Sequence, residues 1–269
     1  MHLKRWISGL ILAPCLILFI LFAPPLLFLM FILGVTLLGL KEYYALALPE
    51  LLPHKKMLGI SLSLLLPLFL YWKDSAGFAA GVTLILILLF VLALSEQRDF
   101  SRQVDRVSRH ILGLFYVPFL LAHFLLMHRM EEGRLWILFT LVVTYCGDTA
   151  AFYVGRTWGR KKLAPAISPG KTVEGGAGAI GGCVAGALFF RFFFLPQFPA
   201  FQALFLAAGV GIIGQLGDLF ESLLKRSAAV KDSGTLIPGH GGLLDRIDSV
   251  LFAAPLVYYY VWGIMKLGI

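Results

Sequence analysis

The chain consists of long apolar runs separated by shorter polar segments. The runs are 16 to 24 residues long, and about 20 apolar residues are enough for a helix to cross the hydrocarbon core of a bilayer. They predict nine transmembrane helices, at residues 6–23, 26–46, 57–72, 76–95, 110–127, 135–154, 175–195, 200–223 and 249–267. The runs are continuous and lack the polar–apolar alternation of a membrane β-barrel, so we expect no strands. The predicted fold is all-α, a polytopic integral membrane protein.

Composition supports this fold class. The chain is 59% hydrophobic and 14% charged, whereas a soluble domain is about half apolar and a quarter charged. The N-terminus has the basic-then-apolar order of a signal peptide. Lipoprotein-type cleavage before Cys15 would place Pro14 at the cleaved bond, so we interpret the segment as an uncleaved first span. The three cysteines show neither a disulfide framework nor zinc spacing.

Basic residues are distributed unequally between the two sides of the predicted membrane topology. With nine spans, 17 Lys and Arg lie on the side of the N-terminus and five on the other side. Because cytoplasmic loops are enriched in Lys and Arg, this asymmetry predicts the orientation of the chain in the membrane. Its N-terminus and polar loops would face the cytoplasm, and its C-terminus would lie outside. The net charge of +8 then reflects topology and bound anions, and no nucleic-acid partner is needed.

Polarity divides the chain into two parts. Residues 1–133 hold about five nearly pure apolar spans, joined by a basic cytoplasmic linker at 95–110. This linker fits a solvated surface helix near anionic head groups. Residues 134–269 hold about four spans with acidic residues and glycine-rich basic loops, and we predict that they form the catalytic membrane region. Within them, the spacing of Gly178, Gly182 and Gly186 indicates close helix packing.

Two segments of the second part carry candidate chemistry. Asp148 lies inside an apolar span, where a carboxylate is costly and faces a partner, an ion or a water-filled cavity. In SPGKTVEGG, Lys171 and Thr172 resemble a P-loop, but Pro165 stands where that motif needs glycine. The segment can still bind a phosphate at a helix start, and the alternative is a basic, capped helix start.

A polar stripe and a polar loop follow. Asp218, Glu221, Ser222 and Lys225 recur at helical spacing within an apolar run, so they must line a cavity or pack inward. In KDSGTLIPGHGGLLDRIDS, residues 231–249, two acids three residues apart follow a glycine-rich turn around a histidine. Carboxylates suit Mg²⁺ and Lys and Arg suit phosphates, a combination typical of phosphoryl-type transfer. One substrate would be water-soluble and the other a lipid phosphate.

These motifs resemble one family. The run SLLKRSAAVKDSGTLIPGHGGLLDRID, residues 222–248, contains the whole signature of the phosphatidate cytidylyltransferases, also called CDP-diacylglycerol synthases. The upstream segments DTAAFYVGRTWGR and SPGKTVEG are similar to further motifs of this family. The resemblance is strong over about residues 145–250, whereas the N-terminal spans are similar only in being apolar helices.

The resemblance implies a reaction, a cofactor and an assembly. CTP and phosphatidate would give CDP-diacylglycerol and pyrophosphate, with Mg²⁺ as cofactor and room for K⁺ beside it. The protein would be a homodimer in the inner (cytoplasmic) membrane. The resemblance also implies that Asp218 and Asp245 bind the metal, and we add Asp148 to this set. The predicted catalytic residues are Asp218, Asp245, Lys225, Arg226, Lys231 and Arg246. The predicted substrate-binding residues are Ser222, Lys171, Thr172, His240, Gly241, Gly242 and Asp248.

Other functions remain open at this point. A membrane kinase or cytidylyltransferase acting on a polyprenol or an ether lipid would use related chemistry. A transporter would also carry intramembrane acids, but near the midplane in both halves, whereas here they gather in one half. A structural protein that only binds anionic lipid would show no activity dependent on CTP and a metal.

Overall fold

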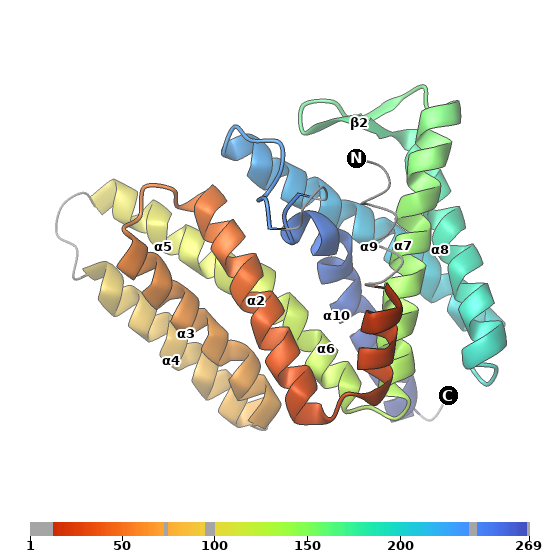
Figure 1. The fold of residues 1–269 in the computed structure, drawn as a ribbon, viewed down its shortest axis with the longest axis horizontal. Helices are drawn as coiled ribbons and strands as arrows, with labels where there is room; N and C mark the ends of the chain where they lie inside the picture. The colour runs from red at the N-terminus through yellow and green to blue at the C-terminus, as the bar shows by residue number, and fades with distance from the viewer. Residues whose placement is uncertain (1–12, 73–74, 95–99, 237–240, 268–269) are drawn as a thin grey trace.

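The computed structural model describes residues 13–72, 75–94, 100–236 and 241–267, and most of these residues are helical (Figure 1). The described α-helices are Ala13–Phe22, α2 (Pro25–Ala47), α3 (Pro53–Trp72), α4 (Ser75–Leu94), α5 (Phe100–Leu114), α6 (Leu120–His128), α7 (Gly133–Trp158), α8 (Val173–Phe194), α9 (Ala200–Ser227) and α10 (Leu244–Leu267). The all-α polytopic fold is confirmed.

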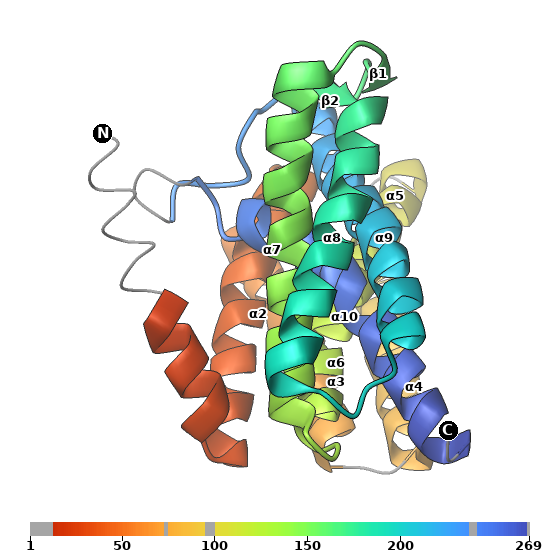
Figure 2. The same cartoon turned by 90° about the vertical axis from the view of Figure 1, so that its right-hand side faces the viewer.

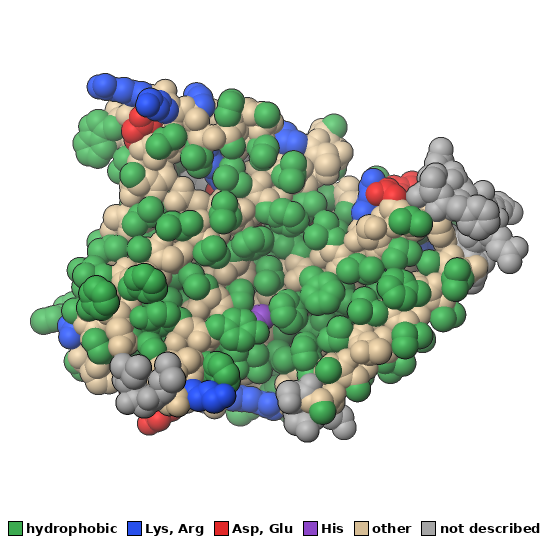
Figure 3. All heavy atoms as spheres, turned by 180° about the vertical axis from the view of Figure 1, so that it is seen from behind, with side chains coloured by type: hydrophobic (Ala, Val, Ile, Leu, Met, Phe, Trp, Pro, Cys, Tyr) green, Lys and Arg blue, Asp and Glu red, His purple; other side chains and the backbone are tan. Residues whose placement is uncertain are grey.

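The number of spans agrees with the prediction except at the N-terminus. Eight helical segments of the described chain are long and apolar enough to cross a membrane. The helix Ala13–Phe22 is shorter and matches the second half of the first predicted span, whose residues 6–12 lie outside the described residues. Figure 3 shows hydrophobic side chains over the middle of one face, with Lys and Arg gathered at its edges.

The basic linker and the fifth span form one helix. α5 continues through a π-helical turn at Phe115–Phe119 into α6, so that helix runs unbroken from Gln103 to His128. The π turn contains Pro118, which has no N–H to donate and therefore disturbs the regular α-helical ladder. The linker predicted as a surface helix thus continues, from Gln103 on, directly into the predicted fifth span. Residues 95–99 lie outside the described residues.

The expectation that no strands occur is wrong for the loop between α7 and α8. Strands β1 (Lys162–Ala164) and β2 (Ser168–Thr172) form an antiparallel hairpin. Span prediction rests on apolar runs, and this polar loop contains none. The base of the hairpin is held by Glu174, whose carboxylate accepts hydrogen bonds from the backbone N–H groups of Arg160 (3.0 Å) and Lys161 (3.2 Å).

The helices that carry the polar motifs pack side by side (Figure 2). α8 lies between α7 and α9, and α9 also packs against α10. The predicted role of the glycines is confirmed, because a Cβ on Gly182 would lie 2.5 Å from the Ala150 Cβ and 2.6 Å from the Cys146 carbonyl oxygen on α7. α10 also packs against α6 and α2. The two predicted parts, residues 1–133 and 134–269, are therefore in contact. Their separation into two functional regions stays a prediction.

Candidate active site

The helices around the polar motifs extend beyond the predicted spans. α9 continues to Ser227 and α10 begins at Leu244, so Lys225 lies on the last turns of α9 and Asp245 on the first turn of α10. Together with α7, α8 and the hairpin, these helices enclose a polar cavity of about 850 Å³. This volume is in the range of small-molecule sites, about 300–1,000 Å³.

Three carboxylates converge beside this cavity. Asp218, Glu221 and Asp248 each offer an oxygen, and these oxygens all lie within 4.8 Å of one another. Asp218 and Asp248 line the cavity, and the Glu221 side chain is fully buried. Among the described residues, this cluster is the group of acids with spacing suited to a metal ion.

This cluster differs from the predicted metal set. Sequence reasoning placed Glu221 on the polar stripe but gave it no role, although its spacing from Asp218 puts both acids on one helix face. Asp148 lines the same cavity, and its carboxylate accepts a long hydrogen bond from the Ser249 hydroxyl (3.4 Å). The role of Asp148 as a metal ligand stays a prediction.

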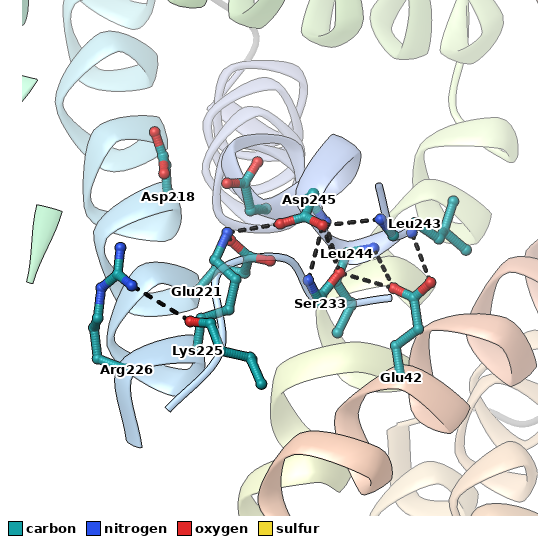
Figure 4. Close-up of polar contacts among 12 residues, drawn as sticks. Glu42, Asp218, Glu221, Lys225, Arg226, Ser233, Leu243, Leu244 and Asp245 are labelled. Carbon is teal, nitrogen blue, oxygen red and sulfur yellow. Dashed lines mark hydrogen bonds and ion pairs between the residues drawn. The ribbon is translucent and has the colours of Figure 1, made fainter. Parts of the chain in front are cut away.

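Asp245 forms an ion pair and hydrogen bonds with groups outside this cluster (Figure 4). Its Oδ1 lies 2.6 Å from the Lys225 Nζ, and its Oδ2 accepts hydrogen bonds from the backbone N–H groups of Ser233 and Gly242, both at 2.9 Å. Asp245 therefore ties the loop after α9 to the start of α10. Its assignment as a metal ligand also stays a prediction.

Two of the three lysines predicted to bind phosphates, Lys171 and Lys225, are each paired with a carboxylate. Lys225 forms ion pairs with both Glu221 and Asp245. Lys171, on β2, lies with its Nζ 2.8 Å from the Asp218 Oδ2. Both lysines line the cavity, so an incoming phosphate competes with carboxylates that are already in place.

Arg246 and Thr172 also line the cavity. The Thr172 hydroxyl accepts a hydrogen bond from the backbone N–H of Gly175 at 3.1 Å and caps α8. This is the capped helix start that the sequence left open as an alternative to phosphate binding. The Arg246 backbone carbonyl accepts a hydrogen bond from the Tyr145 hydroxyl at 3.4 Å.

Two predicted basic residues are not among the described residues that line the cavity. The Arg226 guanidinium donates to the backbone carbonyls of Ile167 (3.1 Å) and Val230 (3.4 Å). It thereby connects the end of α9 to the hairpin and to the following loop. Lys231 is exposed. The structure brings neither side chain to the carboxylates, and their catalytic roles stay predictions.

The predicted substrate-binding residues of the stripe and the loop do not all line the cavity. Ser222 is buried and is not among the described residues of the cavity wall. Gly241 has φ +84°, a left-handed conformation that glycine adopts without strain. The Gly242 N–H binds Asp245, as described above. His240 lies outside the described residues.

The cavity therefore combines two kinds of charge. Its wall includes the carboxylates of Asp148, Asp218 and Asp248 and the cationic side chains of Lys171 and Lys225. Carboxylates are ligands for hard divalent cations, and the cationic groups bind phosphate oxygens. Such a site can neutralise a polyphosphate and hold it in place.

Comparison with known proteins agrees with this chemistry. Residues 3–264, nearly the whole chain, match the cytidylyltransferase family. The chain belongs to this family. It is a nucleotidyltransferase and a multi-pass membrane protein.

Individual relatives are similar over most of their length. The phosphatidate cytidylyltransferase of Bacillus subtilis (strain 168) is 38% identical over 224 residues, covering 79% of this chain and 83% of the relative. That of Synechocystis sp. is 35% identical over 263 residues, covering 84% and 85%. A protein of Escherichia coli (strain K12) named "Uncharacterized protein YnbB" is 37% identical over 241 residues, covering 84% and 76%.

Proposed function

We propose that the protein is a phosphatidate cytidylyltransferase, which transfers CMP from CTP to phosphatidate and releases pyrophosphate. The carrying observation is that Arg246 lines both the polar cavity and an apolar groove of about 430 Å³. The groove is lined by the helix Ala13–Phe22, α2, α6, α7 and α10. Such a junction fits a substrate with a phosphate at one end and acyl chains at the other. The names of two of the relatives described above support the same activity.

The polar cavity is the site we propose for the CTP triphosphate. Lys171 and Lys225 would exchange their carboxylate partners for phosphate oxygens when the nucleotide binds. This exchange is favourable only if another cation takes over the carboxylates, because unpaired buried charges are costly. Binding of the nucleotide and binding of a metal are therefore coupled in this proposal.

The converging carboxylates suit that metal. Asp218, Glu221 and Asp248 offer only oxygen atoms, the donor type that Mg²⁺ prefers, and Mg²⁺ usually shares its coordination with substrate phosphates. Bound there, Mg²⁺ would neutralise charge on the triphosphate. The set implied by the family resemblance, Asp218 with Asp245, is the competing assignment, and K⁺ remains a proposed second cation.

The reaction joins two phosphates. An oxygen of the phosphatidate phosphate attacks the α-phosphorus of CTP, and the bond from that phosphorus to the oxygen bridging to the β-phosphate breaks. Pyrophosphate leaves with the electron pair. Phosphate monoesters are largely ionised at pH 7, with a second pKa of about 6, so the nucleophile needs no strong general base. The task of Arg246 and the two lysines is to hold both phosphates together against their repulsion.

We further propose that the N-terminus and the cavity face the cytoplasm and that the C-terminus lies outside. The unequal distribution of basic residues supports this orientation. The end of α10 also lies away from the hairpin (Figure 1). Single cysteines placed in the hairpin and at the C-terminus should react with impermeant thiol reagents from opposite sides. The homodimer predicted from the family resemblance is tested by the molar mass of the purified protein in detergent.

The activity itself is tested with purified protein, radiolabelled CTP and phosphatidate in mixed micelles. We expect Mg²⁺-dependent formation of labelled CDP-diacylglycerol with equimolar pyrophosphate. A polyprenol kinase would instead release a nucleoside diphosphate, and a cytidylyltransferase for ether lipids would prefer an ether-linked phosphate. Absence of any CTP turnover with all of these lipids would contradict the proposal.

A further inference from the structure

Glu42 is a buried acid of α2 that the proposed chemistry does not use. It is 8% exposed and belongs to a helix long and apolar enough to span the membrane. A carboxylate in such a helix is costly and marks either a pairing or a functional role. Its partners are therefore informative.

The partners of Glu42 lie at the start of α10 and in the loop before it, about 200 residues away in sequence (Figure 4). Its Oε1 accepts a hydrogen bond from the backbone N–H of Leu243 at 2.8 Å. Its Oε2 accepts from the backbone N–H of Leu244 at 2.9 Å and from the Ser233 hydroxyl at 3.0 Å. N–H groups at a helix start lack intrahelical partners and favour a negative charge.

The loop is shaped closely around this carboxylate. A Cβ on Gly234 would lie 2.7 Å from the Glu42 Oε1, and a Cβ on Gly242 would lie 2.6 Å from its Oε2. A side chain at either position would displace the Glu42 carboxylate. Gly234 and Gly242 therefore lie directly against the Glu42 carboxylate of α2.

Ser233 connects Glu42 to the active site. The Ser233 hydroxyl lies 2.9 Å from the Asp245 Oδ2, and its backbone N–H donates to the same oxygen. Asp245 lines the polar cavity, whereas Glu42 is not among the described residues that line it. Glu42 can therefore act on the site only through the groups that it holds.

We propose that Glu42 is a positioning residue of the active site. Its carboxylate holds the first turn of α10 and the Ser233 segment in one arrangement, and so directs Asp245 and Asp248 into the cavity. The proposal rests on the proposed cytidylyltransferase activity for its kinetic test. It assigns a role in the site to a helix of the N-terminal half, which the sequence motifs leave out.

The test is the variant Glu42→Gln, which keeps the size of the side chain. Its amide NH₂ cannot accept a hydrogen bond, so at least one backbone N–H loses its partner. We expect kcat/KM for CTP to fall roughly tenfold to hundredfold, as for other groups that orient ligand residues. We also expect a higher KM for CTP and a higher half-saturating Mg²⁺ concentration. Loss of folded protein would lower only the amount of active enzyme and leave both concentrations unchanged.

A second readout needs no substrate. Trypsin cleavage after the exposed Lys231 should be faster in Glu42→Gln, because the loop is released from α2. Cleavage after Lys161 and Lys162 in the hairpin, also exposed, should be unchanged and serves as the internal control. The variant Glu50→Gln, at an exposed acid in the turn after α2, should match the wild type in both assays.

Ser233→Ala provides an independent check if Glu42→Gln does not fold. It removes one of the three donors to Glu42 and should shift the KM for CTP and the cleavage rate in the same direction. In the double variant, the two effects should be less than additive, because both act through one hydrogen-bond group. The inference would be overturned if Glu42→Gln had the KM values and cleavage rate of the wild type. If Glu42→Gln does not fold, the same result in Ser233→Ala would overturn it. An inactive wild type would contradict the proposed function instead, and the cleavage assay would still decide the role of Glu42.

Discussion

At the scale of single residues, the site holds its carboxylates and lysines in mutual contact. Lys171 binds Asp218, and Lys225 binds Glu221 and Asp245. These ion pairs give both lysines and three of the carboxylates a partner of opposite charge before substrates arrive. In the proposed function these residues have two sets of partners: they bind each other before substrates arrive, and they bind metal and phosphate afterwards.

The choice between the two metal assignments is testable at this scale. If Asp218, Glu221 and Asp248 hold the metal, Glu221→Gln should lower kcat/KM roughly 10²–10³-fold, as for loss of one group that stabilises transition-state charge. It should also raise the half-saturating Mg²⁺ concentration, and weaken Mn²⁺ binding measured by electron paramagnetic resonance without substrates. Asp105→Asn, at an exposed surface pair with Arg109, is the control. A shift in Mn²⁺ affinity in Asp245→Asn but not in Glu221→Gln would favour the competing set.

Lys171 should act mainly on nucleotide binding. In Lys171→Gln we expect the KM for CTP to rise roughly tenfold or more, since a hydrogen bond to a charged group contributes about 1.5–3 kcal/mol. The KM for phosphatidate should change less. The measurement is initial rates at varied CTP and at varied phosphatidate. Lys162→Gln removes the same charge from an exposed position of the same hairpin, and an equal effect there would show that Lys171 acts only through general charge.

The sequence predicts where the polar stripe lies, but it does not predict the partners of the residues in the site. The stripe from Asp218 to Lys225 follows from helical spacing alone. That Asp245 pairs with Lys225, and that Glu42 binds the start of α10, depends on how distant segments meet. A single acid in an apolar span carries no signal of its partner, because any of the loops on that side could supply one.

At the scale of elements, apolar runs determine the helices well and their ends poorly. α9 and α10 extend past the predicted spans through Lys225 and Asp245, because polar residues continue a helix once it leaves the bilayer or lines a cavity. The hairpin was not predicted, since its strands of three and five residues have no periodicity to detect. Its stability depends on backbone bonds to Glu174, which no local pattern reveals.

The contact between α7 and α8 gives a prediction for two adjacent glycines. Gly182→Ala places a methyl group against the Ala150 side chain and the Cys146 carbonyl, so the two helices must separate. Overpacking of this kind costs about 1–3 kcal/mol, and we expect a lower apparent Tm in detergent and lower activity. Gly181→Ala adds the same methyl group where nothing lies within 4 Å. Equal Tm values for the two variants would contradict the close packing of α7 on α8.

At the scale of the whole molecule, the N-terminal half takes part in two features of the site. It supplies Glu42 to the loop, and it supplies α2 and the helix Ala13–Phe22 to the apolar groove. The family motifs lie in the other half, so sequence resemblance alone places the chemistry there. In the proposed function, the lipid-phase helices would therefore also shape how the lipid substrate is held.

The apolar groove gives the last prediction. Val35, on α2, lines the groove, and Val35→Trp should fill part of the space that we assign to an acyl chain. We expect a higher KM for long-chain phosphatidate, a smaller change for a dihexanoyl analogue that needs less of the groove, and an unchanged KM for CTP. Leu84→Trp, at a half-exposed apolar position of α4, controls for adding an indole to the lipid-facing surface. An equal rise in KM for both chain lengths would place the acyl chains elsewhere, while the polar cavity and its carboxylates would keep their proposed roles.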